Sequence, residues 1–392
     1  MVKTVGKTVN RRTPGQTADA CRPDDSRVRT RAVGREVLFI LGVGVILVAV
    51  FVAAFLRPVR DRGIRLWMLN HGPDQLIVVN PDTGEQEKEL LVADGLQQIV
   101  FNHRKDTAFV ANVVDVNNRV TLIDTRSYLK TEQIIVDGVP QGLAVFPGDQ
   151  YLAVITGSKT DFMAGGFDVL DLTTPSVADP RRKRVVYRER DLTLTVSIAV
   201  DDYGENLYCL DAKASRVFIF NSDQRKLVRT IDIGAAPMGL LYPEQGEYFF
   251  VSSIRNDTIA VLNKARDPMD VDIVGKIVYG RFRHMALSPD AKLLYAPVYE
   301  FWEIAVIDVT TLNVVKTYKT EEGCELINIS PFGDDLYAVG KDSGKIFVMD
   351  AETGRLKRTI PTHGEFRDIK VIEESEKPSP GDRRRGTLNQ ES

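Results

Sequence analysis

Three charged residues stand at an even spacing in the C-terminal part of the chain. Glu325 follows Arg283 by 42 residues, Arg367 follows Glu325 by another 42, and His284 and Asp368 come directly after the two arginines. If one repeat unit fills each interval, these side chains lie side by side. Two arginines could then clamp an anion or a carboxylate through paired N–H donors, with Glu325 restraining them. The alternative is a closed ion network in which the charges neutralise one another.

The interval of 42 residues belongs to a repeat that runs through most of the chain. Each unit holds four short runs of β-branched and aromatic residues, such as LLYAPV (293–298) and EIAVIDV (303–309), which read as antiparallel strands. A Pro, Gly or Asp turn recurs at intervals of 42 to 55 residues after seven marker residues, namely Asn102, Phe146, Asp201, Pro243, Ser288, Ser330 and Ile372. A period of about 40 to 50 residues with four strands per unit is typical of a β-propeller blade. We therefore predict an all-β, seven-bladed β-propeller with four-stranded antiparallel blades over residues 64–374.

The strand count also predicts how the ring closes. The first unit, residues 64–92, supplies only a second, a third and a fourth strand, and a lone first-type strand, residues 368–372, is left at the C-terminal end. Pairing of the C-terminal strand with the three N-terminal ones completes the seventh blade. Such a ring has no free sheet edge, so it avoids edge-to-edge aggregation.

Alignment of the units predicts which side chains meet at the channel mouth. One residue from each blade begins the first strand, giving the ring Gln97, Gln141, Val196, Met238, Arg283, Glu325 and Arg367. The loop YEFWE (299–303) opens on the same face, where its aromatic residues either recognise a partner or cap the blade core. The candidate ligand-binding residues are therefore Arg283, His284, Glu325, Arg367, Asp368, Gln141, Tyr299 and Trp302.

The repeats resemble the YVTN-type β-propeller family, which is related to the amine-dehydrogenase heavy-chain-like and lactonase-like seven-bladed propellers. The resemblance covers about residues 64–374 and rests on SPDA (288–291), SPFG (330–333), FVAN (109–112) and VMDAETG (348–354). It implies the scaffold and leaves the activity open. Members that oxidise amines or bind d1 haem take cofactors from partner subunits or dedicated His ligands. This sequence shows neither, so we predict no cofactor.

A second feature is the apolar segment VLFILGVGVILVAVFVAAFL, residues 37–56, which has no charge and no proline. Twenty apolar residues in a helix are long enough to cross the roughly 30 Å hydrocarbon core of a bilayer. We predict a single transmembrane helix that acts as an uncleaved signal anchor. It follows a disordered basic tail (1–36) and precedes a juxtamembrane linker (57–63), and a second disordered tail covers 375–392.

The orientation of this segment follows from the flanking charges. The N-terminal tail carries nine Lys and Arg residues, so the positive-inside rule predicts a cytoplasmic tail and a propeller that is periplasmic or at the cell surface. The small residues Val52, Ala53 and Ala54 leave an alternative, in which the apolar segment is a signal peptide and the propeller is secreted after cleavage.

Composition and motifs exclude several classes of function. A net charge of -3 gives no support to a nucleic-acid partner. The four histidines show no HxH or HxxxH spacing, and CxxCH, P-loop and GxSxG motifs are absent. We therefore predict no metal site.

Two functions remain. The first is a non-catalytic, membrane-tethered scaffold that presents the channel face to a protein or to a small anionic ligand. The second is an enzyme of lactonase-like or quinoprotein dehydrogenase-like type that uses Arg283, Glu325 and Arg367. An enzyme needs a carboxylate cluster for a metal or a base with a perturbed pKa. A single acid between two arginines stays ionised and holds a metal poorly, which favours the scaffold.

Overall fold

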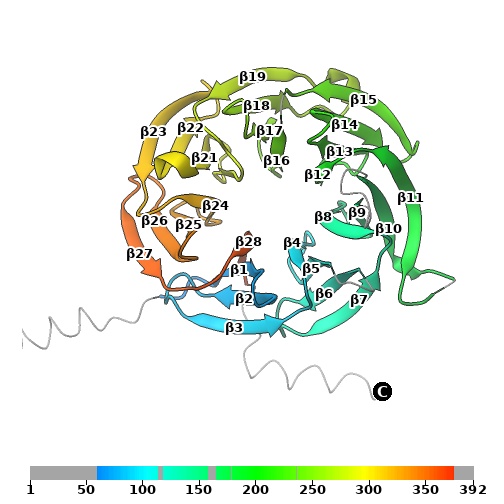
Figure 1. The fold of residues 1–392 in the computed structure, drawn as a ribbon, viewed down its shortest axis with the longest axis horizontal. Helices are drawn as coiled ribbons and strands as arrows, with labels where there is room; N and C mark the ends of the chain where they lie inside the picture. Colours follow the sequence, from blue (N-terminus) through cyan, green and yellow to red (C-terminus); the bar gives the residue numbers. More distant parts are fainter. Residues whose placement is uncertain (1–59, 114–117, 158–164, 178, 235, 375–392) are drawn as a thin grey trace, which may run out of the picture. The chain divides into compact units, whose positions relative to one another are not determined.

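The computed structural model describes residues 60–374 apart from 114–117, 158–164, 178 and 235. In this part of the chain, seven four-stranded antiparallel sheets surround a central axis as the blades of a propeller (Figure 1). The predicted all-β fold is confirmed. No helix formed by the described residues is both long enough and apolar enough to cross a membrane. The predicted span 37–56 and both predicted tails lie outside the described residues.

Six blades each use four consecutive strands, numbered here from the innermost outwards. Blade 2 consists of β4 (Leu96–Phe101), β5 (Thr107–Asn112), β6 (Arg119–Asp124) and β7 (Lys130–Ile135). Blade 3 consists of β8 (Val139–Val145), β9 (Tyr151–Gly157), β10 (Gly165–Pro175) and β11 (Lys183–Leu192). Blade 4 consists of β12 (Thr195–Val200), β13 (Asn206–Asp211), β14 (Arg216–Asn221) and β15 (Lys226–Asp232). Blade 5 consists of β16 (Pro237–Leu241), β17 (Tyr248–Ser253), β18 (Thr258–Asn263) and β19 (Ile273–Val278). Blade 6 consists of β20 (Ala286–Leu287), β21 (Leu293–Val298), β22 (Glu303–Asp308) and β23 (Asn313–Lys319). Blade 7 consists of β24 (Cys324–Ile329), β25 (Asp335–Gly340), β26 (Ile346–Asp350) and β27 (Leu356–Ile360). Two short 3-10 helices, η1 (Pro268–Asp270) and η2 (Tyr299–Phe301), lie in loops of blades 5 and 6.

Blade 1 joins the two ends of the propeller. Its sheet has the order β28 (Phe366–Glu373), β1 (Ile64–Asn70), β2 (Gln75–Val79) and β3 (Gln86–Leu91), so the closure by one C-terminal and three N-terminal strands is confirmed. We call the face with the loops between strands 4 and 1 and between strands 2 and 3 the upper face. The lower face carries the loops between strands 1 and 2 and between strands 3 and 4.

The core follows from the alternation of side chains along each strand. In β1 all seven residues are buried, because even and odd positions face different neighbouring blades. Leu66 and Met68 pack toward blade 7, whereas Trp67 and Leu69 pack toward blade 2. The outermost strands have a solvated face, as the largely exposed β3 shows. Period-two alternation thus builds one apolar layer on each side of a blade.

The first strand of blade 6 is short. The run 284–288 forms only the two-residue strand β20, with the pairs Ala286↔Tyr295 and Leu287↔Leu294. The backbone before it leans toward blade 5, where the carbonyl oxygen of Arg283 lies 2.4 Å from the place of a Cβ on Gly239. Only glycine accepts this approach, so Gly239 determines where Arg283 stands.

The closing strand is held by backbone and side-chain contacts. β28 pairs with β1 from Ile64↔Glu373 to Asn70↔Phe366, and the Glu374 N–H donates to the Gly63 carbonyl at 2.7 Å. Without β28, the inner edge of β1 and its apolar neighbours would be open to water.

The N-terminal entry adds an ion network between blades 1 and 7. The Arg62 guanidinium lies 2.7 Å from Asp82, 2.6 Å from Asp334 and 2.5 Å from Asp335. Arg65 binds Asp61 at 2.9 Å, and its hydrogen bond lowers the pKa of Asp61 to about 2.

Removal of β28 tests the role of closure. We expect a chain ending at Gly364 to unfold at a melting temperature at least ~10 °C lower, because the paired edge and its apolar contacts are lost. A chain ending at Glu374 keeps every contact of β28 and serves as the control, with an unchanged melting temperature. Equal melting temperatures by circular dichroism for the two truncated chains would contradict the role of β28.

The Asp61–Arg65 pair predicts an acid-dependent loss of stability. The pKa of Asp61 is lowered on folding, so its contribution is complete above the unfolded value of 3.8 and fades as the pH falls toward about 2. We expect Asp61→Asn to lower the urea midpoint at pH 7, and the difference from the parent to shrink below pH 4. Asp223→Asn on an exposed turn is the control. A difference that stays constant down to pH 2.5 would refute the assignment.

Candidate functional site

The inner strands surround a cavity on the propeller axis. It has a volume of about 680 Å³ and is lined by residues from all seven blades. The seven residues that the repeat alignment places at the mouth all line it: Gln97, Gln141, Val196, Met238, Arg283, Glu325 and Arg367. The cavity also reaches the turns of the lower face at Glu244 and Pro331. It is therefore a channel whose upper mouth carries the predicted ring.

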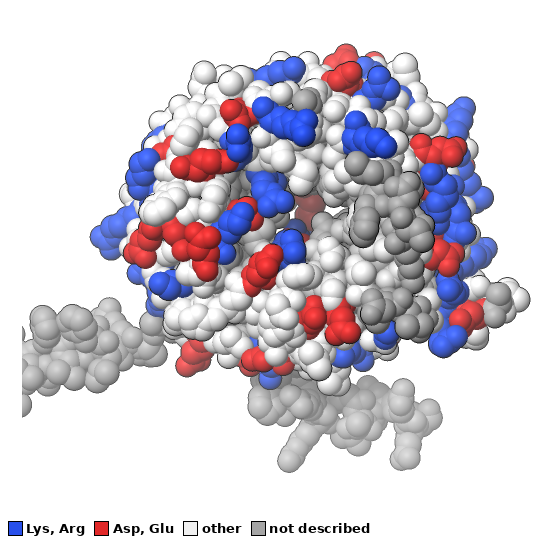
Figure 2. Space-filling model, viewed as in Figure 1, with Lys and Arg blue, Asp and Glu red and all other residues white. Residues whose placement is uncertain are grey.

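Charge is concentrated on one side of the upper mouth. Arg283 Nη1 lies 3.2 Å from both carboxylate oxygens of Glu325, and Lys341 Nζ lies 2.6 Å from Glu325 Oε1. The hydrogen bond to Glu325 raises the pKa of Lys341. Figure 2 shows Lys and Arg side chains around the central hollow near β21, β24 and β28. Blades 6, 7 and 1 thus form a cationic arc.

The predicted Arg-Glu-Arg arrangement needs a correction. Arg367 pairs with Glu365 at 3.2 Å, and its place at Glu325 is taken by Lys341. The loop between β25 and β26 carries Lys341 to the mouth from the same blade as Glu325. The strand alignment could not show this, because it says nothing of how far a loop side chain reaches. The sequence feature that could have indicated this contact is the position of Lys341 in a loop on the mouth side of the ring.

The aromatic loop divides into a packed part and an exposed part. Tyr299 lies where a Cβ on Gly323 would stand, and its ring is 4.8 Å from Lys341 Nζ, which links the loop to the cationic arc. Trp302 is 53% exposed and adopts a left-handed φ of 53°. A bulky residue in this conformation is uncommon and stores backbone strain. Tyr299 therefore supports the mouth, and Trp302 presents its ring to solvent.

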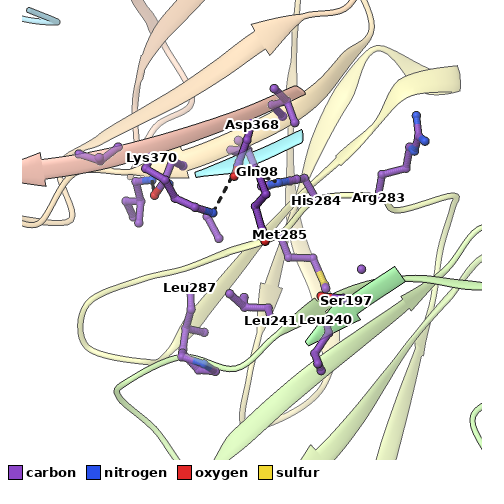
Figure 3. A pocket seen from close by; sticks show the side chains of 18 of the residues that line it. Gln98, Ser197, Leu240, Leu241, Arg283, His284, Met285, Leu287, Asp368 and Lys370 are labelled. Atoms are coloured by element: carbon purple, nitrogen blue, oxygen red, sulfur yellow. Dashed lines mark hydrogen bonds and ion pairs between the residues drawn. The ribbon is translucent and has the colours of Figure 1, made fainter. Parts of the chain in front are cut away.

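Below the mouth lies a belt of polar side chains around Asp368 (Figure 3). Asp368 is 2% exposed and accepts a hydrogen bond from the Ile99 N–H at 3.1 Å. Lys370 Nζ lies 3.3 Å and His284 Nε2 lies 3.8 Å from Asp368 Oδ1. In the next blade, Gln98 Oε1 accepts from the Leu143 N–H at 2.6 Å. Gln98 and Lys370 were missed by sequence reasoning, which compared only the first residue of each strand.

His284 is neutral at physiological pH. Burial lowers the pKa of His284, and the Asp368 carboxylate opposes this shift only in part. The opposite wall of the channel is apolar and is formed by Leu240, Leu241 and Leu287 (Figure 3). The channel therefore offers cationic donors at its mouth, a neutral imidazole beside a carboxylate at mid-depth, and an apolar wall.

Other predicted residues carry less of the site. Gln141 lines the mouth on the side away from the cationic arc, close to Gly157. Within the described residues, no group of three or more His, Cys, Asp or Glu side chains is placed to hold a metal ion. Cys209 and Cys324 are buried free thiols, and burial raises the pKa of Cys324 to about 12, so neither is an active nucleophile.

Comparisons with known proteins identify the fold. No family model matches the sequence, and no curated protein matches it by sequence. The periplasmic gluconolactonase of Pseudomonas aeruginosa superposes with a TM-score of 0.64 at 15% identity, over 79% of this chain and 99% of that chain. Hydrazine synthase of Kuenenia stuttgartiensis gives a TM-score of 0.60 at 16% identity, over 74% and 94%. A protein of unknown function from Desulfotomaculum acetoxidans gives 0.67 at 13%, over 79% and 99%. These likenesses show the propeller fold alone, and the resemblance to YVTN repeats stays a prediction.

The half-buried imidazole of His284 predicts a second pH effect. Folding lowers the pKa of His284 below its usual 6.5, so the stability contributed by the neutral ring is complete above pH 6.5 and is lost as the pH falls below it. We expect His284→Gln, which copies Gln98 of blade 2, to flatten the decline of the urea midpoint between pH 7.5 and 5. The control is His103→Gln on the lower face, where the side chain is 42% exposed. An unchanged slope in the His284 variant would contradict the shift.

Proposed function

We propose that the propeller binds a small organic anion at the upper mouth of its channel. The observation that carries the proposal is the shared contact of Arg283 and Lys341 with Glu325, beside a cavity of about 680 Å³ that Arg283, Glu325 and Arg367 line. Groups held in this way lose little conformational freedom when a ligand binds. A structural ion network alone would not require Arg283 and Arg367 to line a cavity.

The arginines at the mouth keep donors for a ligand. Arg283 donates to Glu325 through Nη1, and Arg367 Nη2 lies 3.2 Å from Glu365. A guanidinium has five N–H donors, so both can bind a carboxylate while they keep these pairs. Glu365 is 67% exposed, which makes Arg367 the donor that a ligand frees most easily.

The channel wall suggests the rest of the ligand. Leu240, Leu241 and Leu287 face the polar belt of His284 and Asp368 across the cavity. A molecule with a carboxylate at one end, an apolar edge and hydroxyl groups matches these surroundings. A hydroxy acid or a sugar acid has this combination, and it is the ligand class that we propose.

The setting of this binding protein is part of the proposal. The apolar segment 37–56 supports a single-pass membrane anchor with a cytoplasmic N-terminus. The propeller would then meet its ligand in the periplasm or at the cell surface, or in the medium if the segment is cleaved. A protein partner could dock over the same mouth, where Trp302 is exposed.

A second candidate function is hydrolysis of a lactone, which the polar belt favours. Neutral His284 can take a proton from water as the water oxygen attacks the lactone carbonyl, and Lys370 can stabilise the oxyanion. The ring C–O bond then breaks, and His284 returns the proton to the ring oxygen, which yields a hydroxy acid. The fold shared with a gluconolactonase supports this candidate, and its product belongs to the proposed ligand class.

Calorimetry with acetate, succinate, citrate and gluconate tests the binding proposal. We expect at least one to bind, with an affinity at least tenfold weaker in Arg367→Ala and Arg283→Ala, because each loses a charge-assisted hydrogen bond of about 1.5–3 kcal/mol. Arg355→Ala is the matched control, since this exposed arginine lies on a lower-face turn. Binding that is absent throughout, or equal in all variants, would overturn the proposal.

A pH-stat assay with δ-gluconolactone tests the second candidate. If the chain is a hydrolase, acid release exceeds the spontaneous rate and falls at least 100-fold in His284→Gln. Gluconate binding without hydrolysis would assign the channel to binding alone. Hydrolysis that survives in the His284 variant would remove that residue from the reaction.

A further inference from the structure

A second large hollow lies on the lower face, where the chain enters the propeller. This groove of about 1250 Å³ is lined by the entry segment 60–65, the end of β28 and turns of blades 2 and 7. It shares Pro331 and Val371 with the channel, so it opens beside the lower end of the channel. We call it the closure groove, because it spans the junction between the first and last strands of the propeller.

Four cations of the closure groove are weakly paired or unpaired. The side chains of Arg60 and Arg126 have no hydrogen bond or ion pair within the described part of the chain, although Arg126 interacts electrostatically with Asp124. Arg104 is 73% exposed and lies 3.3 Å from Asp106 and 3.7 Å from Asp149. Lys105 Nζ lies 3.5 Å from an exposed Glu244.

Most carboxylates of the groove are already engaged. Asp61 binds Arg65, and Asp106 accepts from the Asn102 amide at 2.6 Å. Glu374 accepts from the Tyr128 hydroxyl. Among the acids that line the groove, only Glu373 has no side-chain partner in the described residues. Within the described residues, the groove is therefore lined by two arginines without an ion pair, two exposed cations with weak pairs, and one uncommitted carboxylate.

The arginines of the closing network behave differently. Arg62 is surrounded by Asp82, Asp334 and Asp335, and Arg65 by Asp61 and Glu87. The N–H donors of Arg62 and Arg65 are therefore engaged in ion pairs that stabilise the fold. Arg60, Arg104 and Arg126 line the same groove, and of these three only Arg104 has ion-pair partners among the described residues, Asp106 and Asp149. The excess of donors points to a ligand with several acceptor oxygens.

We propose that the closure groove binds a phosphate-type oxyanion, either inorganic phosphate or a phosphomonoester. A tetrahedral dianion can accept paired N–H donors from several arginines at once, which a single carboxylate cannot. The site is separate from the upper mouth and does not depend on the function proposed there. A bound phosphate bridges the N-terminal entry of blade 1 to the turns of blade 2, so it stabilises the closed ring by mass action.

Two sources could supply the phosphate group. One is a soluble phosphate compound that enters through the open groove. The other is the headgroup of an anionic phospholipid, since Arg60 follows the apolar segment 37–56 by only four residues. Both sources present the same oxygens to the same arginines.

The test uses the full chain and a double variant, Arg104→Ala with Arg126→Ala. In the first arm, sodium phosphate is added at constant ionic strength to the parent in phosphatidylcholine nanodiscs. In the second arm, phosphatidic acid is included in the nanodisc. We expect at least one of the two to raise the melting temperature of the parent. The double variant should melt as the parent does without phosphate, and should lose at least tenfold in phosphate affinity. Arg355→Ala and the upper-mouth pair Arg283→Ala with Arg367→Ala are the matched controls and should keep the response.

Each outcome decides the proposal. A response to soluble phosphate that the double variant loses supports a soluble ligand, and a response confined to phosphatidic acid supports a lipid headgroup. A parent that responds to neither overturns the proposal. It is also overturned if the double variant responds as the parent does, or if Arg355→Ala loses the response equally. Loss in the upper-mouth variant alone would move the phosphate site to the channel.

Discussion

The pairing of β28 with β1 is the interaction on which the rest of the propeller depends. It joins residues about 300 positions apart and closes a row of sheets into a ring. The contact also carries Arg367 and Asp368 into the channel, next to residues of blades 6, 7 and 2. Both the cationic arc and the polar belt therefore exist only in the closed ring.

The polar belt shows that one set of residues serves both fold and site. The innermost strand of each blade has one edge that faces the channel and lacks a partner strand. Asp368 and Gln98 satisfy N–H groups on that edge of the following blade, at Ile99 and Leu143. Unsatisfied buried N–H groups are costly, which explains why polar side chains line an otherwise apolar bore. In the same belt His284 is desolvated and stays neutral, and this gives the channel a group capable of proton transfer.

Arginine has two distinct roles in this molecule. At the closing junction, Arg62 forms ion pairs with three carboxylates and links blades 1 and 7. Arg283 and Arg367 at the upper mouth have one carboxylate partner each among the described residues, and in the closure groove Arg104 has two weak partners, whereas Arg60 and Arg126 have no ion pair there. Arginines whose N–H donors are all engaged by carboxylates stabilise the fold, whereas arginines with free donors can bind a ligand. Net charge alone conceals this division.

The sequence by itself determined the number of blades, the three-plus-one closure and the seven residues of the upper mouth. Strand alternation and a repeat near 42 residues can be read along the chain, and because every blade has the same register, equivalent sequence positions occupy equivalent places in each blade. Only the tertiary structure decided which charges meet. Lys341 contacts Glu325 in place of Arg367, and Arg60 and Arg126 line one groove, because such placements depend on how loops and blades come together in space. A linear repeat encodes the order of the blades, whereas such distances arise only when the ring is closed.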